Sequence, residues 1–423
     1  MKLSDRVEIV HRKNTFAIDR RKISITSQCM TPLIRKVLSI NWVLVLVMLG
    51  LLMYGVYVIE SAARHLPQGG EWYAERQRLW IVLGMVVYVV TSLIDYRLFK
   101  YLGIPMYVVG VGLMILAIYK GNAVHQLSVG GVSFQPAQFA VVAGIILISF
   151  VLQEMHRWHA VFNMPFVKVG VILVLSLVPL GLVAKMGDMG SALVWVPVIA
   201  CVMLVSGAPF RYLALFSMIG LFLIPPAFYV VFPKVSPRGT DRVQLYIDTL
   251  QGKKLDVRGN AYAQHHVFMA VGRSGYKGLG HMADANKQSL HARRYIPWKT
   301  AHNDFIFAVI AEEQGFRGTM LLVTAFSLLV IQCIFVAYYS RDLSGQIIVS
   351  AVAALIFAYV FQSVGMCSGL LPITGIPLPL VSYSGTFVLM CTFMLGLVQS
   401  VWIHRNNPTP EQSEKSMELL EAV

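Results

Sequence analysis

Long apolar runs constrain this chain more than any other feature of its sequence. Of its 423 residues, 57% are hydrophobic and only 13% are charged. An ordinary soluble domain carries about 25% charged residues. Runs of roughly 20 apolar residues match the hydrocarbon thickness of a bilayer, where a single segment can satisfy its own backbone only as a helix. The sequence therefore predicts an all-α polytopic membrane protein.

We expect about ten transmembrane helices, with one large extracytoplasmic loop between the seventh and the eighth. The spans are expected near residues 38–59, 79–94, 104–119, 137–153, 165–184, 190–206, 210–232, 314–339, 346–366 and 385–404. This division gives a basic tail at 1–37, a transmembrane domain at 38–404 that includes the outer loop 233–313, and a C-terminal tail at 405–423.

The distribution of basic residues predicts the orientation of the chain. Nine Lys and Arg residues precede residue 38, so the N-terminus is expected in the cytoplasm. An even number of spans returns the C-terminus to the same side and places 233–313 outside. That loop is also rich in Lys and Arg, but the rule is weak for loops longer than about 60 residues.

The net charge of +14 and the five cysteines exclude some functions. The basic residues are concentrated in the N-terminal tail and the long loop, and no aromatic-basic nucleic-acid module accompanies them. Anionic lipid headgroups or a pyrophosphate-bearing substrate explain this charge better. The cysteines are scattered without a CxxC pair, so we expect neither a disulfide framework nor a metal site made of them.

The stretch 302–315 brings three carboxylates, Asp304, Glu312 and Glu313, to the outer boundary of the membrane. Asp304 is expected either to cap a helix or to act in catalysis, and the local pattern leaves both open. Two features favour catalysis: burial at the membrane boundary raises the basicity of a carboxylate, and the Lys and Arg residues that precede Asp304 can bind an anionic substrate. On a continuous helix from residue 304, Glu312 lies about 80° from Asp304 and Glu313 about 180° away. At most Glu312 could then assist Asp304 directly. Glu313 is expected to be structural, packing toward other helices or pairing with a cation such as Arg317, four residues later.

Three other segments carry candidate residues. Asp188 lies between two expected spans on the outer side, where it caps a helix or lines the cavity of Asp304. The glycine-rich stretch 272–280, with Arg273 and Lys277, predicts either a phosphate contact or an ordinary turn, and the turn is favoured. The uncharged stretch 368–386, rich in Pro and Gly, predicts a re-entrant or tightly folded outer loop.

Four motifs resemble the SEDS family of cell-wall polymerases, RodA and FtsW, and the resemblance covers about 38–404. They are AHNDFIFAVIAEEQGFRG at 301–318, LLPITGIPLPLVSYSGT at 370–386, GDMGSALV at 187–194 and FQPAQ at 134–138. The resemblance implies an inverting glycosyltransferase of the bacterial cytoplasmic membrane that polymerises lipid II during elongation or division. It also implies a class B penicillin-binding protein, a transpeptidase, as partner.

The resemblance places the family's essential aspartate on Asp304, as the base that takes a proton from the acceptor sugar. The residues expected to contact the substrate are His302, Glu312, Asp188, Gln135, Arg273, Lys277, Ser382 and Tyr383. Basic loop residues or a divalent cation, Mg²⁺ or Mn²⁺, would stabilise the leaving pyrophosphate. No metal ligand and no other cofactor are assigned.

The chain also departs from the family pattern near the expected fourth span. His125-Gln126 stand where the family has Arg-Trp, Gln138 replaces a Glu, and Val141 replaces a Lys. Losing the Glu and the Lys together is consistent with deletion of a charge pair, which a protein tolerates better than loss of one partner. Two alternatives stay open: a flippase for lipid-linked precursors, and a catalytically weakened scaffold of a cell-wall complex.

Overall fold

The computed structural model describes residues 36, 39–120, 127–129, 132–158, 160–226, 233, 237–259, 261–284 and 289–407. The chain divides into two compact units, Met1–Asn41 and Trp42–Val423. The second unit contains the helices from residue 42 to residue 404. Nearly all of the basic tail, and the C-terminal tail beyond residue 407, lie outside the described residues.

Eight helices of the described residues are long and apolar enough to cross a membrane, and two apolar helices are shorter. The eight spans contain α3 (Trp42–Ala62), α4 (Gly69–Leu93), α5 (Lys100–Lys120), α6 (Pro136–Trp158), α7 (Pro165–Lys185), α13 (Ile306–Tyr339), α14 (Leu343–Ser368) and α15 (Gly385–His404). The shorter ones are α8 (Met189–Val205) and α9 (Phe210–Pro226). The all-α multi-pass fold is thus confirmed, whereas the count of ten spans stays a prediction.

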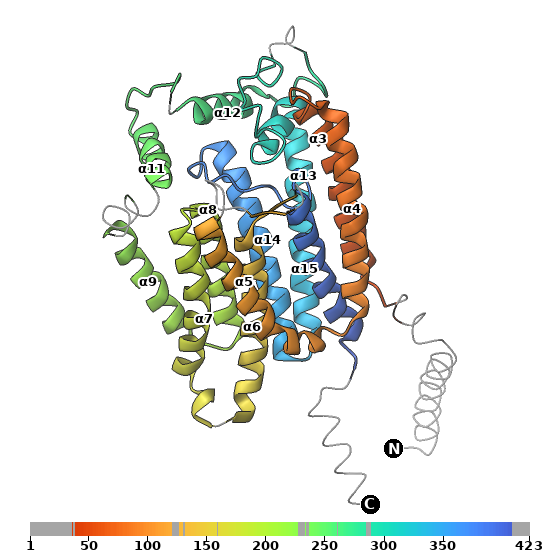
Figure 1. The fold of residues 1–423 in the computed structure, drawn as a ribbon, viewed down its shortest axis with the longest axis vertical. Helices are drawn as coiled ribbons and strands as arrows, with labels where there is room; N and C mark the ends of the chain where they lie inside the picture. The colour runs from red at the N-terminus through yellow and green to blue at the C-terminus, as the bar shows by residue number, and fades with distance from the viewer. Residues whose placement is uncertain are drawn as a thin grey trace, which may run out of the picture. The chain divides into compact units, whose positions relative to one another are not determined.

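The helices form a bundle with two distinct ends (Figure 1). One end, called here the loop end, carries the helices α11 (Pro237–Leu250) and α12 (Tyr262–Arg273) and the segment 369–384. The opposite end carries the short 3₁₀ helices η1 (Tyr96–Phe99) and η2 (Ala160–Asn163). The long connection between α9 and α13 therefore gathers at a single end of the bundle.

Strand structure is limited to one small hairpin among the described residues. β1 (Leu127–Val129) pairs antiparallel with β2 (Val132–Phe134), and Leu127 faces Phe134 in the register. This hairpin links α5 to α6. It is a minor addition to a helical fold that otherwise matches the sequence prediction.

The bundle is built around α6, α14 and α15, which are the most buried of the candidate spans. α5 and α7 are the least buried, and they carry exposed apolar side chains such as Ile104 and Val174. Exposed aliphatic side chains on membrane-crossing helices are expected to face lipid, because the bilayer interior is as apolar as they are. The layout therefore places α5 and α7 at the periphery.

Candidate active site

Asp304 lies in a tight run of turns just before α13. The carbonyl oxygen of Thr300 accepts hydrogen bonds from the backbone N–H groups of Asn303, Asp304 and Phe305, at 3.1, 3.0 and 3.3 Å. These bonds delay the helix, which begins at Ile306 with Phe305 at its N-cap, and no side chain caps it there. The helix-cap interpretation of Asp304 is therefore wrong, since its carboxylate lies outside the first helical turn.

The segment 369–384 is the tightly folded loop that the sequence predicts, and it holds the chain before Asp304. Ser382 donates its hydroxyl to the Asn303 carbonyl at 2.6 Å and accepts from the Leu378 N–H at 2.8 Å. The backbone N–H of Tyr383 donates to the His302 carbonyl at 3.0 Å. Ser382 is only 1% exposed, and its hydroxyl is engaged in these two hydrogen bonds within the protein.

Gly375 lies beside the Asp304 carboxylate and the guanidinium of Arg242. A Cβ atom at Gly375 would lie 3.4 Å from Asp304 Oδ2 and 3.6 Å from Arg242 Nη1. Its φ of +76° is in the left-handed region that glycine adopts most easily. Because Gly375 has no side chain, there is room beside the loop for the Asp304 carboxylate and the Arg242 guanidinium.

Arg242 reaches the site because α11 packs on the same loop. Its Nη1 lies 3.4 Å from the Ile373 carbonyl oxygen and 3.5 Å from that of Thr374. One helical turn later, the Tyr246 hydroxyl donates to the Leu370 carbonyl at 2.9 Å. Residues four apart lie on one helix face, so this face of α11 is fixed against 369–384.

Asp188 approaches the site from the start of α8. It caps that helix, as one of its two predicted roles requires, by accepting from the Ser191 N–H at 3.0 Å. Gln135 donates to its second oxygen at 2.7 Å. A Cβ atom at Gly190 would lie 2.7 Å from Ile376 Cγ1, so only glycine lets this turn pack so closely on 369–384.

The surroundings of Asp304 favour its protonated form. Its side chain is half-buried. The pKa of Asp304 is raised from 3.8 to about 7: burial is the largest cause, Arg242 lowers the pKa, and the nearby Asp188 carboxylate raises it. A carboxyl group with a pKa near the working pH is well suited to accept a proton from a substrate. Asp188 therefore has a second role besides capping, since its charge acts on Asp304.

His302 lies beside the site as a neutral aromatic ring. Burial lowers the pKa of His302 to about 4, and its side chain packs between Tyr73 and Tyr383, at ring-centroid distances of 5.1 and 5.4 Å. Tyr73 and Tyr383 also contact each other edge to face, at 5.0 Å. The three rings form an aromatic cluster next to the 302–304 turn.

Glu312 does not assist Asp304, and that expectation is wrong. Its carboxylate accepts from the backbone N–H of Leu290, from that of His291 at 3.0 Å and from the Ser289 hydroxyl at 3.3 Å. Because the helix begins at residue 306 and not at 304, the assumed angle between the two carboxylates does not apply. Glu312 instead anchors the loop segment 289–291.

Glu313 is structural, as expected. It is 2% exposed, it accepts from the Ser61 hydroxyl at the end of α3, and its second oxygen lies 3.2 Å from His281 Nδ1. It thus joins α13, α3 and the outer loop. An ion pair with Arg317, the alternative partner considered for it, is not among the described ion pairs of Glu313.

The glycine-rich stretch 272–280 packs against a kink in α13. Gly315 interrupts the helix with φ 66° and ψ −162°, and the N–H of Gly280 donates to the Glu313 carbonyl at 2.8 Å. The N–H of Phe316 donates in turn to the Gly275 carbonyl at 2.9 Å. The glycines therefore form a backbone junction, which agrees with the favoured turn interpretation. Arg273 and Lys277 flank it as exposed side chains.

The donor set near Asp304 does not by itself define a metal site. Among the residues that the structure describes, no group of three or more His, Cys, Asp or Glu side chains is arranged to hold a metal ion. We therefore assign no residue to the Mg²⁺ or Mn²⁺ considered above. Of the departures near the fourth span, Val141 is 1% exposed within the apolar core, and His125-Gln126 lie outside the described residues.

Two members of the site, Arg242 and Gly375, were not among the candidates chosen from the sequence. Arg242 is one of many basic residues in the long loop, and no local pattern distinguishes it. A usable signal was its spacing from Tyr246, because an Arg and a Tyr four residues apart present two hydrogen-bond donors on one helix face. Gly375 was visible only as part of a Gly- and Pro-rich run.

The fold and the site together define a multi-pass helical membrane protein in which the Asp304 carboxyl group, with its raised pKa, lies at the loop end of the bundle. The sequence model of the cell cycle proteins FtsW, RodA and SpoVE matches residues 36–407. The chain belongs to this family.

Named relatives and solved structures agree with this assignment. The chain is 29% identical to the peptidoglycan glycosyltransferase MrdB of Escherichia coli K12, over 86% of this chain and 93% of that protein. It is 26% identical to a probable peptidoglycan glycosyltransferase FtsW of Trichlorobacter lovleyi, over 85% and 92%.

Two solved structures share the fold. One belongs to a peptidoglycan synthase complex described as coordinating polymerisation and crosslinking, with a TM-score of 0.69 and 24% identity, covering 87% of this chain and 99% of that one. The other is the rod shape determining protein RodA of Thermus thermophilus, with a TM-score of 0.61 and 23% identity over 87% and 98%.

Proposed function

We propose that this protein is a peptidoglycan glycosyltransferase that polymerises lipid II into glycan strands, with Asp304 as the general base. The observation that carries the proposal is the Asp304 carboxyl group, whose pKa is raised by burial to about 7 between Gly375 and Arg242. Membership of the family and the names of the relatives support this class of reaction.

In the proposed reaction, the 4-hydroxyl oxygen of the acceptor sugar attacks the anomeric carbon of the donor. The new C–O bond forms as the bond to the pyrophosphate oxygen breaks, and the hydroxyl proton passes to Asp304. A single displacement inverts the anomeric centre, so an α-linked donor gives a β-linkage. General-base catalysis of this kind contributes about 10²–10⁴-fold.

Arg242 is proposed to serve both the base and the leaving group. Its guanidinium lowers the pKa of Asp304, so part of the carboxyl group is ionised at neutral pH. It is exposed at the loop end, where a planar guanidinium can bind a departing pyrophosphate in a bidentate manner. Charge stabilisation at a leaving group is often the largest single contribution to catalysis.

The other candidates take roles that follow from their contacts. Asp188, held by Gln135, sets the charge next to Asp304. Tyr383, which is partly exposed and packs on the buried His302, offers an aromatic surface for a sugar ring. Ser382 positions the turn that carries Asp304. The residues proposed for first contact with the anionic substrate are the exposed Arg273 and Lys277.

We place the protein in the bacterial cytoplasmic membrane, with both termini in the cytoplasm and the loop end outside, acting in cell elongation or division. A class B penicillin-binding protein with transpeptidase activity is the proposed partner. The shared fold with a chain of a synthase complex that couples polymerisation to crosslinking supports this partner.

The decisive experiment supplies labelled lipid II to the purified protein with its transpeptidase and resolves the glycan products on a gel. Wild type and Asp241→Asn, a control that removes an exposed carboxylate next to Arg242, are expected to give ladders. Asp304→Asn is expected to give none. Ladders from Asp304→Asn would refute the assignment of the base.

The same preparation separates the two alternatives. A wild type that makes no ladders but moves lipid II across vesicle membranes would identify a flippase. A folded wild type that does neither, yet still binds the transpeptidase, would identify a scaffold. Both results would overturn the proposed enzymatic function.

A further inference from the structure

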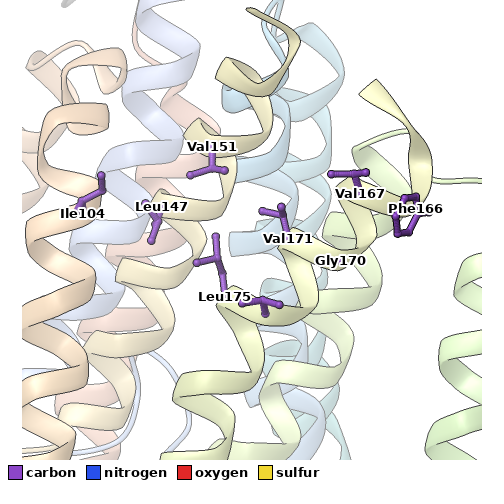
Figure 2. Close-up of a pocket in the computed structure, with 9 residues that line it drawn as sticks. Ile104, Leu147, Val151, Phe166, Val167, Gly170, Val171 and Leu175 are labelled. Carbon is purple, nitrogen blue, oxygen red and sulfur yellow. The ribbon is translucent and has the colours of Figure 1, made fainter. Parts of the chain in front are cut away.

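An apolar groove lies among three helices, at the periphery of the bundle. It encloses about 560 Å³ between α5, α6 and α7. The side chains that line it come from all three helices, and none is polar (Figure 2). They include Ile104 of α5, Val151 of α6, and Phe166 and Val171 of α7. Its volume falls within the range of about 300–1,000 Å³ that small-molecule pockets occupy.

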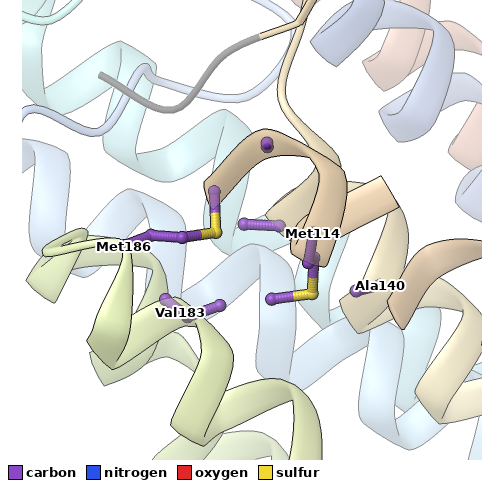
Figure 3. Close-up of a cluster of buried hydrophobic side chains, with 6 residues drawn as sticks. Met114, Ala140, Val183 and Met186 are labelled. Atoms are coloured by element: carbon purple, nitrogen blue, oxygen red, sulfur yellow. The ribbon is translucent and has the colours of Figure 1, made fainter. Parts of the chain in front are cut away.

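The groove forms because α7 packs tightly against α5 and α6 along only part of its length. Towards the loop end, Met114, Ala140, Val183 and Met186 form a packed cluster of the three helices (Figure 3). Nearer the opposite end of the bundle, a polar contact also joins α5 to α7. On α7, the residues that line the groove lie between the start of the helix and that contact.

That polar contact is the hydrogen bond from the Tyr107 hydroxyl of α5 to the Leu175 carbonyl of α7, at 2.7 Å. Pro179 lies four residues after Leu175 and has no N–H, so this carbonyl lacks its usual helical partner. An unsatisfied carbonyl facing lipid costs several kcal/mol. Tyr107 satisfies it, which fixes the spacing of the two helices and closes one end of the groove.

The groove is about one leaflet deep, and that leaflet is the one farther from Asp304. From Phe166 to Leu175 the helix rises about 14 Å, close to half of a hydrocarbon core of about 30 Å. α7 begins next to η2 at the opposite end and finishes near Asp188, whose N–H donates to the Val183 carbonyl. The substrate tail of the proposed reaction belongs to the other leaflet.

We propose that this groove binds one acyl chain of a phospholipid from the leaflet opposite the candidate active site, with the phosphate of that lipid at Lys168. Lys168 lies three residues before Val171 and seven before Leu175, on the same stripe of α7 as these lining residues. A lysine stem lies along apolar surface while its ammonium reaches the membrane interface, where the phosphate is found. Helices on three sides hold this chain longer than the lipid that merely surrounds the bundle.

Two glycines of α7 provide a matched pair of variants. A Cβ atom at either Gly170 or Gly181 would meet no atom within 4 Å, so both sites accept a larger side chain. Gly170 lines the groove, whereas Gly181 lies eleven residues on, about three turns along the same face and outside it. Gly170→Phe should fill the groove, and Gly181→Phe should leave it open.

The test is native mass spectrometry of the detergent-purified full chain after repeated washing. Wild type and Gly181→Phe are expected to retain one phospholipid, identified by mass and fragmentation. Gly170→Phe is expected to retain it in an amount lower by about tenfold, which corresponds to a loss of about 1.4 kcal/mol. Lys168→Gln should lower retention by a smaller factor.

Equal retention by Gly170→Phe and wild type would overturn the proposal, as would a wild type that retains no phospholipid. A retained polyprenyl lipid that Gly170→Phe removes would assign the groove to the substrate and refute a phospholipid site. Elution volume and melting temperature show that each variant is folded. Since lipid mass is the readout, the result does not depend on glycosyltransferase activity.

Discussion

Replacing Asp304 with asparagine should stabilise the folded protein at neutral and alkaline pH while abolishing glycan synthesis. The free-energy change follows from the pKa of this carboxyl group, which burial raises from 3.8 to about 7. Each pKa unit corresponds to about 1.36 kcal/mol, so keeping Asp304 ionised in the folded protein costs up to about 4 kcal/mol. Asparagine has nearly the same shape and carries no charge.

The pH dependence of this stabilisation has a defined sign. The folded protein holds the Asp304 proton more tightly than the unfolded chain, because the folded pKa is the higher of the two. The stability of the wild type therefore falls as the pH rises from about 4 to about 7 and changes no further above that. The advantage of Asp304→Asn is thus absent below pH 4 and complete above pH 7.

The assay compares melting temperatures of wild type and variant in the same detergent at several values between pH 5 and pH 8. In domains of 150–250 residues, about 1 kcal/mol shifts the melting temperature by about 2–4 °C, and larger chains shift less. A gain of several degrees at pH 8 that shrinks towards pH 5 is expected. Because unfolding of such a protein is often irreversible, all scans use one heating rate.

The exposed Asp241 provides the control, since Asp241→Asn should change the melting temperature little at any of these values. If Asp304→Asn lowers the melting temperature at pH 8, the contacts of the ionised carboxylate stabilise the folded protein by more than the burial of its charge destabilises it. If the gain is the same at pH 5 and pH 8, protonation is not its source. Either result would refute the argument from the raised pKa.

Four further substitutions test the contacts of Asp304 and the anchoring of the outer loop by Glu312. Arg242→Gln should raise the pKa of Asp304 and move the acid limb of the pH–rate profile to higher pH. Asp188→Asn should move that limb to lower pH, because asparagine still caps α8 but removes the like charge. Gly375→Ala should cost about 1 kcal/mol in thermal unfolding through its φ of +76°, and it should slow glycan synthesis by crowding the carboxylate. Glu312→Ala should lower stability by about 2–4 kcal/mol in the same assay, because it leaves two backbone N–H groups of the outer loop unsatisfied.

The two pH–rate predictions form an internal control. Both substitutions lie beside Asp304, so a general disturbance of the site would lower the rate without moving the limb. Shifts in opposite directions can arise only from opposite charges acting on one titrating group. Equal shifts, or none, would mean that the acid limb reports a group other than Asp304.

The parts of the fold that depend only on residues close together in the sequence could be predicted. Apolar length located the membrane helices, because a span needs about 20 residues whatever its neighbours are. The run of Pro and Gly in 368–386 predicted a tight loop for a similar reason, and Ile376, Leu378 and Val381 are buried within it. The cap at Asp188 was also local, since it depends on the three residues that follow.

The site was less predictable because its contacts join distant segments. Nothing in the sequence near Arg242 shows that α11 packs on the loop containing Gly375. The expected link between Asp304 and Glu312 was wrong for a different reason. It assumed helical geometry from residue 304, but the helix begins at Ile306, so the rotation of about 100° per residue does not relate Asp304 to the side chains that follow.

That delayed helix start explains how Asp304 acquires its chemistry. Had the helix begun two residues earlier, Asp304 would have capped it, and bonds from backbone N–H groups would have held its carboxylate ionised with a low pKa. Instead the Thr300 carbonyl takes the N–H groups of residues 303–305 into a turn, and Ser382 holds that turn in place. The carboxylate is left with burial, a cation and a second acid as its surroundings, and these place its pKa near 7. Because this carboxylate does not cap α13, it remains available to take a proton from a substrate.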